Sequence, residues 1–232
     1  MELVILPGIL LLLLAFIAIA IWLSWHFRAR RTDAMRSLAD EMSMDFDNQL
    51  PGTVDRAIRD FGLFNRGRSR KVRNVMTTQT DASRLTVFDY HFVTGGGNHT
   101  RHHAFTVVAM VSADLRCPSF ELYPETLWSK IGSAVGFQDI DFDSHPAFSS
   151  AYVLKGANEV ALRDFFDHRR LDYFSAHRGL TVQVSDGVMV YSEKRVKIEH
   201  IRRAMAGAYQ VFEALRTDGD PSDRDDAITA VT

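Results

Sequence analysis

The sequence predicts an α+β protein, with an amino-terminal transmembrane helix followed by a mainly antiparallel sheet packed with helices in a two-layer domain. Two observations support this fold class. Residues 3–25 contain no charged side chain, and ~20 apolar residues suffice to cross the core of a bilayer. The β-rich segments that follow come in runs, with helices between the groups rather than after every strand, which is typical of α+β domains.

The charges around the apolar stretch predict its orientation. Basic residues follow it at once: Arg28, Arg30, Arg31 and Arg36. Only Glu2 and the amino terminus precede it, so the positive-inside rule predicts that everything after Trp25 lies in the cytoplasm. The amino terminus is therefore expected outside.

A cleavable secretory signal is the alternative interpretation. Ala18-Ile19-Ala20 offers a cleavage pattern of the A-x-A kind. However, no basic region precedes the apolar stretch, and a signal peptide needs one. Cys117 is the only cysteine, which suits a reducing compartment. We therefore favour the anchor.

Four segments are expected along the chain. They are the anchor over 1–27, a juxtamembrane helix over 28–45, an α+β domain over 46–216 and a disordered acidic tail over 217–232. Within the second segment, Ala34, Leu38 and Met42 recur every four residues, so a helix is expected over 32–44, capped by Thr32 or Asp33. A short helix over 54–61 opens the domain.

The strands of the domain are predicted from runs rich in Val, Phe, Tyr and Thr, separated by turn residues. Strands are expected over 71–78, 84–94, 104–113, 119–123, 151–155, 180–184 and 188–191. Asp186-Gly187 between the last two is a strong hairpin signal. Helices are expected over 125–135, 158–168 and 198–215, the last with apolar residues at spacings of three and four. This apolar face must pack on the sheet or on another helix.

The middle of the chain resembles a known group of proteins. The similar motifs are Asn74-Val75-Met76, Phe88-Asp89-Tyr90, Phe120-x-Leu122-x-Pro124-Glu125, Asp139-Ile140-Asp141-Phe142, His145-Pro146-x-Phe148-Ser149 and Tyr152-x-Leu154-x-Gly156. Over about Phe61 to Phe166 the chain resembles bacterial membrane-associated proteins with a single amino-terminal anchor and no assigned activity. The resemblance implies a bacterial source and a shared domain, and it carries over no catalytic residue. With a bacterial source, the expected location is the bacterial inner (plasma) membrane.

One acidic cluster could hold a metal ion. Asp139, Asp141, Asp143 and His145 alternate with other residues, so in a strand all four would share one face. Such oxygen-rich ligands suit Mg²⁺, Mn²⁺ or Ca²⁺. Residues two apart on a strand lie ~7 Å from each other, too far for all of them to hold one ion in a straight strand. We therefore expect a solvated face of a strand and no metal.

A second cluster is rich in histidine. His102 and His103 follow Gly95-Gly96-Gly97, and imidazoles could bind Zn²⁺. No Cys or Glu completes a zinc motif, and the glycines lack the G-K-[ST] of a phosphate loop. A glycine run between two β-rich segments supplies the positive φ angles of a hairpin tip. We expect a hairpin connection here.

A basic segment could contact lipid. It contains Arg66, Arg68, Arg70, Lys71 and Arg73. Together with Arg28, Arg30 and Arg31, these residues are the candidates for contact with anionic lipid head groups, where each is worth ~1 kcal/mol. The alternative is a solvated turn whose charges pair with acidic neighbours.

These observations favour a membrane-tethered cytoplasmic binding or scaffolding module with an unknown protein partner. A metal-dependent hydrolase using the acidic cluster, perhaps with His102 or His103, is one alternative, and a small-ligand sensor is another. Cys117 follows a strand as a small hydrophobe would, so a thiol nucleophile is not favoured. We expect no cofactor, and with a pI near 6.5 and no aromatic-basic motif, no nucleic-acid partner.

Overall fold

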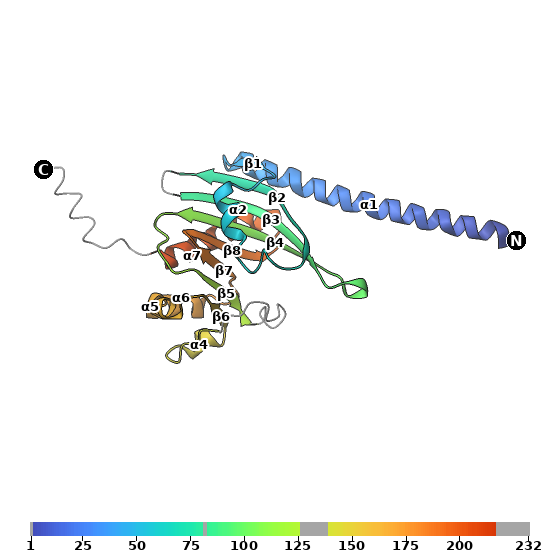
Figure 1. Ribbon diagram of the computed structural model, residues 1–232. Coiled ribbons are helices and arrows are strands. Elements are labelled where there is room, and N and C mark those ends of the chain that lie inside the picture. The colour runs from blue at the N-terminus through green and yellow to red at the C-terminus, as the bar shows by residue number, and fades with distance from the viewer. Residues whose placement is uncertain (1, 81–82, 126–138, 217–232) are drawn as a thin grey trace.

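The computed structural model describes residues 2–80, 83–125 and 139–216. Its fold is α+β, with an eight-stranded antiparallel sheet in the order β1-β2-β3-β4-β8-β7-β5-β6 (Figure 1). The strands are β1 (Asp45–Asp47), β2 (Arg68–Gln79), β3 (Ser83–Thr94), β4 (Arg101–Ser112), β5 (Phe120–Pro124), β6 (Tyr152–Lys155), β7 (Val182–Ser185) and β8 (Val188–Lys194). The helices are α1 (Glu2–Glu41), α2 (Gly52–Ile58), α4 (Pro146–Ser149), α5 (Glu159–Phe165), α6 (His168–Ala176) and α7 (Ile201–Leu215).

Helix α1 is continuous from the apolar stretch into the domain, and most of it projects away from the sheet (Figure 1). The separate helix expected to begin at Thr32 is therefore wrong. The Thr32 hydroxyl does not cap a helix, and its oxygen lies 3.2 Å from the carbonyl oxygen of Arg28 one turn earlier in α1. Met35, Leu38 and Ala39 are buried in the domain core. The last turns of α1 thus belong to the folded domain.

Two hairpins form where the sequence predicts them. Strands β3 and β4 pair along their whole length, from Ser83 opposite Ser112 to Thr94 opposite Arg101. The glycine run between them supplies positive φ angles at Gly95 and Gly97, followed by the 3-10 turn η1 (Gly97–His99). Strands β7 and β8 are joined at Asp186-Gly187, both with positive φ. Both hairpin predictions are confirmed.

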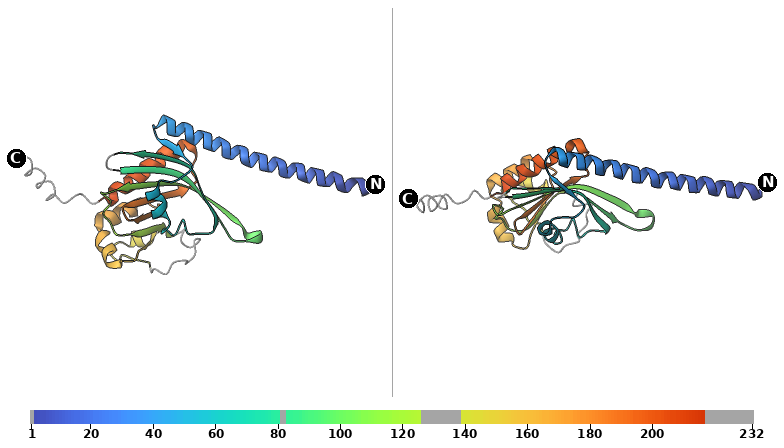
Figure 2. Two further views of the ribbon diagram at one scale, coloured as in Figure 1. Left: turned by 45° about the horizontal axis from the view of Figure 1, so that its top comes forward. Right: turned by 90° about the horizontal axis from the view of Figure 1, so that it is seen from above.

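The sheet has a hydrophobic core on each face. On one face, residues such as Met76 and Val108 pack with α1, α6 and α7. On the other, their neighbours Val75 and Val107 pack with α2 and the segment that follows it. Figure 2 shows α7 and the end of α1 above the sheet and α2 below it. The predicted two-layer arrangement, a sheet with helices on one face, is therefore incomplete. Helix α2 and the segment after it also cover part of the opposite face.

The remaining helices differ from the sequence prediction at their ends. The helix expected over 158–168 ends as α5 at Phe165, and a separate helix, α6, begins at His168, where the Asp167 side chain caps it by accepting the N–H of Arg170 at 2.9 Å. The last helix begins with the 3-10 turn η2 (Ile198–His200) before α7. Most of the helix expected over 125–135, and the tail over 217–232, lie outside the described residues.

Candidate functional site

An ion pair joins α1 to the sheet. The Nε and Nη2 atoms of Arg31 donate to the two carboxylate oxygens of Asp89, each at 2.7 Å. Nη1 of Arg31 donates to the carbonyl oxygen of Val196 at 2.8 Å. The side chains are 10% and 1% exposed, so solvent screens this pair little. A two-pronged arginine–carboxylate pair is among the strongest polar contacts in proteins.

Asn74 extends this contact into a network. It lies at an irregularity of the β2–β3 pairing and has a φ of 52°, a conformation that Asn tolerates better than most residues. Its Nδ2 donates to Asp89 at 2.9 Å, and its Oδ1 accepts the Thr32 hydroxyl at 2.8 Å. Side chains of α1, β2 and β3 are thereby fixed to one another.

One end of the sheet gathers basic side chains. The start of β2, the end of β3, the start of β4 and the end of β8 meet there, with Val93 opposite Arg68 and Phe105 opposite Lys194. We call this the basic end, and its residues are Arg66, Arg68, Arg70, Lys71, Arg73, Arg101, Lys194 and Arg195. In Figures 1 and 2, α1 leaves the domain toward the side on which the β3–β4 hairpin projects from this end.

A cleft of about 700 Å³ lies at the basic end. Cations and histidines line it together with aromatic rings, and we call it the basic cleft. Its basic and aromatic residues are Arg66, Arg101, Lys194, Arg195, His102, His103, Phe92, Phe105 and Tyr123. None of the described residues that line it is acidic. Its chemistry suits a ligand that carries negative charge.

His103 is held in the wall of the basic cleft. Its Nε2 lies 2.8 Å from the Thr94 hydroxyl, and its ring stacks on Phe92 with the ring centres 4.6 Å apart. Loss of solvent lowers the pKa of His103, and the nearby charges of Arg66 and Arg101 lower it further. The imidazole is therefore neutral at neutral pH.

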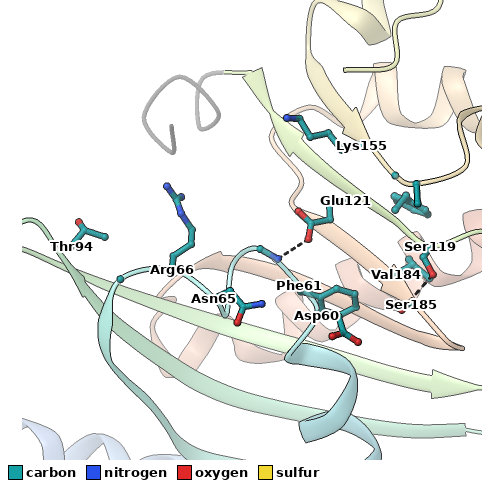
Figure 3. Close-up of a pocket in the computed structure, with 15 residues that line it drawn as sticks. Asp60, Phe61, Asn65, Arg66, Thr94, Ser119, Glu121, Lys155, Val184 and Ser185 are labelled. Atoms are coloured by element: carbon teal, nitrogen blue, oxygen red, sulfur yellow. Dashed lines mark hydrogen bonds between the residues drawn. The ribbon is translucent and has the colours of Figure 1, made fainter. Parts of the chain in front are cut away.

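A second cavity of about 610 Å³ adjoins the basic cleft, because Arg66 and Thr94 line both. We call it the apolar cavity. Phe61, Phe120 and Val184 contribute buried apolar surface to it. In Figure 3, Arg66 lies on one side of the cavity and Phe61 and Asp60 lie on the other, and the Arg66 side chain points away from them.

A hydrogen-bond chain connects Glu121, in the wall of the apolar cavity, with Tyr123, in the wall of the basic cleft. Glu121 accepts the backbone N–H of Gly62 at 2.6 Å through one oxygen and the Tyr123 hydroxyl at 2.7 Å through the other. Gln183 in turn donates to the Tyr123 oxygen at 2.7 Å. Burial and the Glu121 charge raise the pKa of Tyr123 well above its usual value. Tyr123 therefore stays protonated and can keep donating to Glu121.

The acidic cluster is not on a strand. Residues 139–145 form irregular backbone with a turn at Asp143, which corrects the expected strand. Asp139 accepts the N–H of Leu154 at 2.9 Å, and His145 lies 3.6 Å from an oxygen of Asp172. Within the described ranges, no three His, Cys, Asp or Glu side chains are grouped so that they could hold a metal ion. His102 and His103 line the basic cleft, whereas Asp139, Asp141 and Asp143 do not.

The lipid-contact candidates have different surroundings. Arg31 is taken up by Asp89, and Arg70 and Arg68 donate to the carbonyls of Phe64 and Gly95. Arg28 and Arg30 are exposed on α1, and Lys71 is exposed on β2. Arg28, Lys71 and Arg73 also line a cavity of about 520 Å³ beside α1. Arg66 lies between the basic cleft and the apolar cavity.

Cys117 does not have the environment of a reactive thiol. Burial raises its pKa to about 12, so almost none of it is thiolate at neutral pH. A thiolate is the nucleophilic form of cysteine. The sequence interpretation as a small packed hydrophobe agrees with this environment.

Sequence reasoning missed several residues of the site. They are Asp89, Asn74, Arg101, Lys194, Arg195, Lys155 and Glu121. A usable signal existed for Arg101 and Lys194, because basic residues at the start of one predicted strand and at the end of another can meet at one end of an antiparallel sheet. No local signal marks Asp89 as the partner of Arg31, since 58 residues separate them.

The comparisons with known proteins identify a fold. No family model matches the chain, and no curated protein matches it. The crystal structure of the mycobacterial trehalose monomycolate transport factor A, TtfA, is similar with a TM-score of 0.56. The two chains share a fold. Their sequences are 12% identical, and the alignment covers 80% of this chain and 94% of TtfA.

Proposed function

We propose that this chain is a membrane-tethered cytoplasmic binding module whose basic end rests on the anionic inner surface of a bacterial membrane. The observation that carries the proposal is that α1 and the basic end point to the same side of the domain. Helix α1 leaves the domain on the side toward which the basic end and its hairpin point (Figure 1). A bilayer that held α1 would therefore face the cations of the sheet.

The surface of α1 supports the tether. The part of α1 from Leu13 to Glu41 is long and apolar enough to cross a membrane by length and composition. Phe16, Trp22 and Trp25 are each more than half exposed, since the domain does not cover them. An apolar surface of this extent calls for lipid or a partner. Lipid is the occupant that the flanking arginines favour.

The charges of the basic end support the surface contact. Each Lys or Arg close to an anionic leaflet contributes ~1 kcal/mol. A tether adds to this by holding the patch at high local concentration beside the membrane. In TtfA the same fold belongs to a trehalose monomycolate transport factor. For this chain we propose binding at the membrane, with the other faces of the domain open to a protein partner.

A probe at the hairpin tip tests the proposal. Gly96 has an extended φ of −154°, and a Cβ added there would meet nothing within 4 Å. The Gly96→Cys variant of the full chain is labelled with an environment-sensitive dye and placed in nanodiscs. We expect a blue-shifted emission with phosphatidylglycerol and not with phosphatidylcholine. Salt should reverse the shift, since the Debye length falls from ~30 Å at 0.01 M to ~8 Å at 0.15 M.

Matched variants identify the residues responsible. Replacing Lys71 and Arg73 by Gln in the labelled chain should weaken the shift. Arg169 is exposed on α6, away from the basic end, so Arg169→Gln should leave it unchanged. Identical spectra in the two lipids, or equal effects of the two sets of variants, would contradict the proposed contact.

A further inference from the structure

Two cavities with different chemistry meet at one arginine. The basic cleft and the apolar cavity share only Arg66 and Thr94 among their described lining residues. One side of this junction offers cations without any acidic lining residue, and the other offers buried phenylalanine and valine side chains. A molecule that spans the junction would need an anionic end and an apolar end.

We infer that the two cavities form one binding site for a single-chain lipid with an anionic head, such as a lysophospholipid or a fatty acid. The head lies in the basic cleft and the chain in the apolar cavity. This inference rests on the proposed binding role and names its ligand class. It does not depend on the contact of the basic end with the bilayer surface.

Arg66 is the strongest argument for the head position. It is half-buried and makes no hydrogen bond or ion pair with the described residues. Loss of solvent lowers its pKa, which means that its charge is poorly compensated where it lies. A buried charge is costly until it is paired. A phosphate or carboxylate between Arg66 and Arg101 would supply the missing hydrogen-bond acceptors.

The dimensions and polarity of the apolar cavity suit one chain. Its volume of about 610 Å³ is within the range of ~300–1,000 Å³ that small-molecule sites occupy. Of its two acidic lining residues, Glu121 already accepts a hydrogen bond at each oxygen, and Asp60 is exposed. Lys155, which is 8% exposed, adds a cation to the same cavity. The cavity therefore offers an apolar lining in which the Glu121 charge is already hydrogen-bonded.

Native mass spectrometry of the full chain in detergent tests the inference. The probes are lysophosphatidylglycerol and lysophosphatidylcholine with the same acyl chain. We expect one lysophosphatidylglycerol adduct per chain and at least ~10-fold less adduct with the zwitterionic lipid, as a loss of charge-assisted hydrogen bonds predicts. Oleate should compete for the same adduct. Absence of a one-to-one adduct, or equal binding of both lysolipids, would overturn the inference.

Two variants separate the head from the chain. Arg66→Gln combined with Arg101→Gln should lower the adduct with acyl chains of every length, while Arg169→Gln should not change it. Ala157→Trp adds bulk at an exposed position that lines the apolar cavity. It should lower the adduct of a long-chain lysolipid more than that of a short-chain one. Equal effects on both chain lengths would refute the chain position.

The same Ala157→Trp chain distinguishes this inference from the proposed function. Labelled at Gly96→Cys, it should keep the phosphatidylglycerol-dependent emission shift, because the variant leaves the basic end intact. If the wild-type chain shows the emission shift but no lysolipid adduct, the cavity site is contradicted and the surface contact is not. If the wild-type chain binds the lysolipid but shows no emission shift, the surface contact is contradicted and the cavity site is not.

Discussion

Arg31 and Asp89 meet across 58 residues of sequence in a two-pronged ion pair, with both nitrogen–oxygen distances at 2.7 Å. The pair joins the projecting helix to a central strand of the sheet. Since Asp89 is only 1% exposed, its charge depends on Arg31 and Asn74 for compensation. The stability of the domain should therefore depend on a residue that the sequence assigns to the edge of the membrane.

Arg31→Gln should lower the free energy of unfolding of a fragment spanning 26–216 by about 3–5 kcal/mol, because it leaves a buried carboxylate without its cation. Urea denaturation followed by circular dichroism measures this. The exposed pair of Arg59 with Asp55 supplies the control, since Arg59→Gln removes a contact worth only ~0.2–1 kcal/mol. Equal losses in the two variants would show that the Arg31 pair is not special.

Asn74→Ala and Asn74→Gly separate hydrogen bonding from backbone conformation. Both variants lose the side-chain contacts with Asp89 and Thr32. Only Ala also carries a Cβ into the left-handed region, at a cost of ~1–2 kcal/mol. We expect Ala to be the less stable of the two by about that amount in the same urea assay. A Gly variant as unstable as the Ala variant would mean that φ at this position contributes nothing.

His103 should make the domain less stable in mild acid. Its pKa is lowered in the folded state, whereas an unfolded histidine takes up a proton near pH ~6.5. The stability that this neutral imidazole provides is thus present above that pH and is lost as the pH falls below it. His103→Gln should reduce the slope of unfolding free energy against pH in this window. It should not abolish the slope, because burial also lowers the pKa of His91.

Cys117 should resist alkylation in the folded protein. A rise of its pKa from 9.0 to about 12 lowers the thiolate population about 1,000-fold near neutral pH. Iodoacetamide labelling followed by mass spectrometry should be slow in buffer and fast in guanidinium chloride. Rapid labelling of the folded chain would contradict the raised pKa of this half-buried thiol. Slow labelling also keeps the Gly96→Cys probe selective.

The arginines after the apolar stretch predict a cytoplasmic carboxyl terminus. A fluorescent protein fused after Thr232 should therefore be fluorescent in bacterial cells, and alkaline phosphatase fused there should be inactive. The opposite pair of results would reverse the topology and restore the secretory interpretation.

The sequence predicted the strands and hairpins well, because strand composition and turn residues act within a few neighbouring residues. The glycine run at Gly95 and the Asp186-Gly187 turn need only their own backbone conformations to act. Over 139–145 the strand prediction was wrong, although Ile140 and Phe142, which alternate with the acidic residues, are buried. There the Asp139 side chain accepts the N–H of Leu154, and the N–H of Ile140 donates to the Leu154 carbonyl. These contacts take the place of the regular backbone hydrogen bonds that a strand would make.

The candidate site was only partly predictable, because it depends on contacts between distant segments. The basic segment around Lys71 was recognised, but its union with Arg101 and Lys194 follows from the antiparallel order of β2, β3, β4 and β8. Arg31 was read as a lipid contact because nothing near it in the sequence indicates Asp89. The apolar cavity could not be inferred at all, since its walls come from five separate parts of the chain.

Because α1 is one continuous helix, its apolar stretch and the folded domain are rigidly connected. With no hinge between the apolar stretch and Met35, any rolling or tilting of the helix would turn the sheet with it. Each residue of an α-helix advances the azimuth by about 100°. Adding a single alanine between Phe27 and Arg28 would thus swing the hairpin tip around the helix axis, whereas a longer insertion completing whole turns would restore its heading. If a bilayer holds α1 as we propose, the length of this helix sets which surface of the domain faces the bilayer.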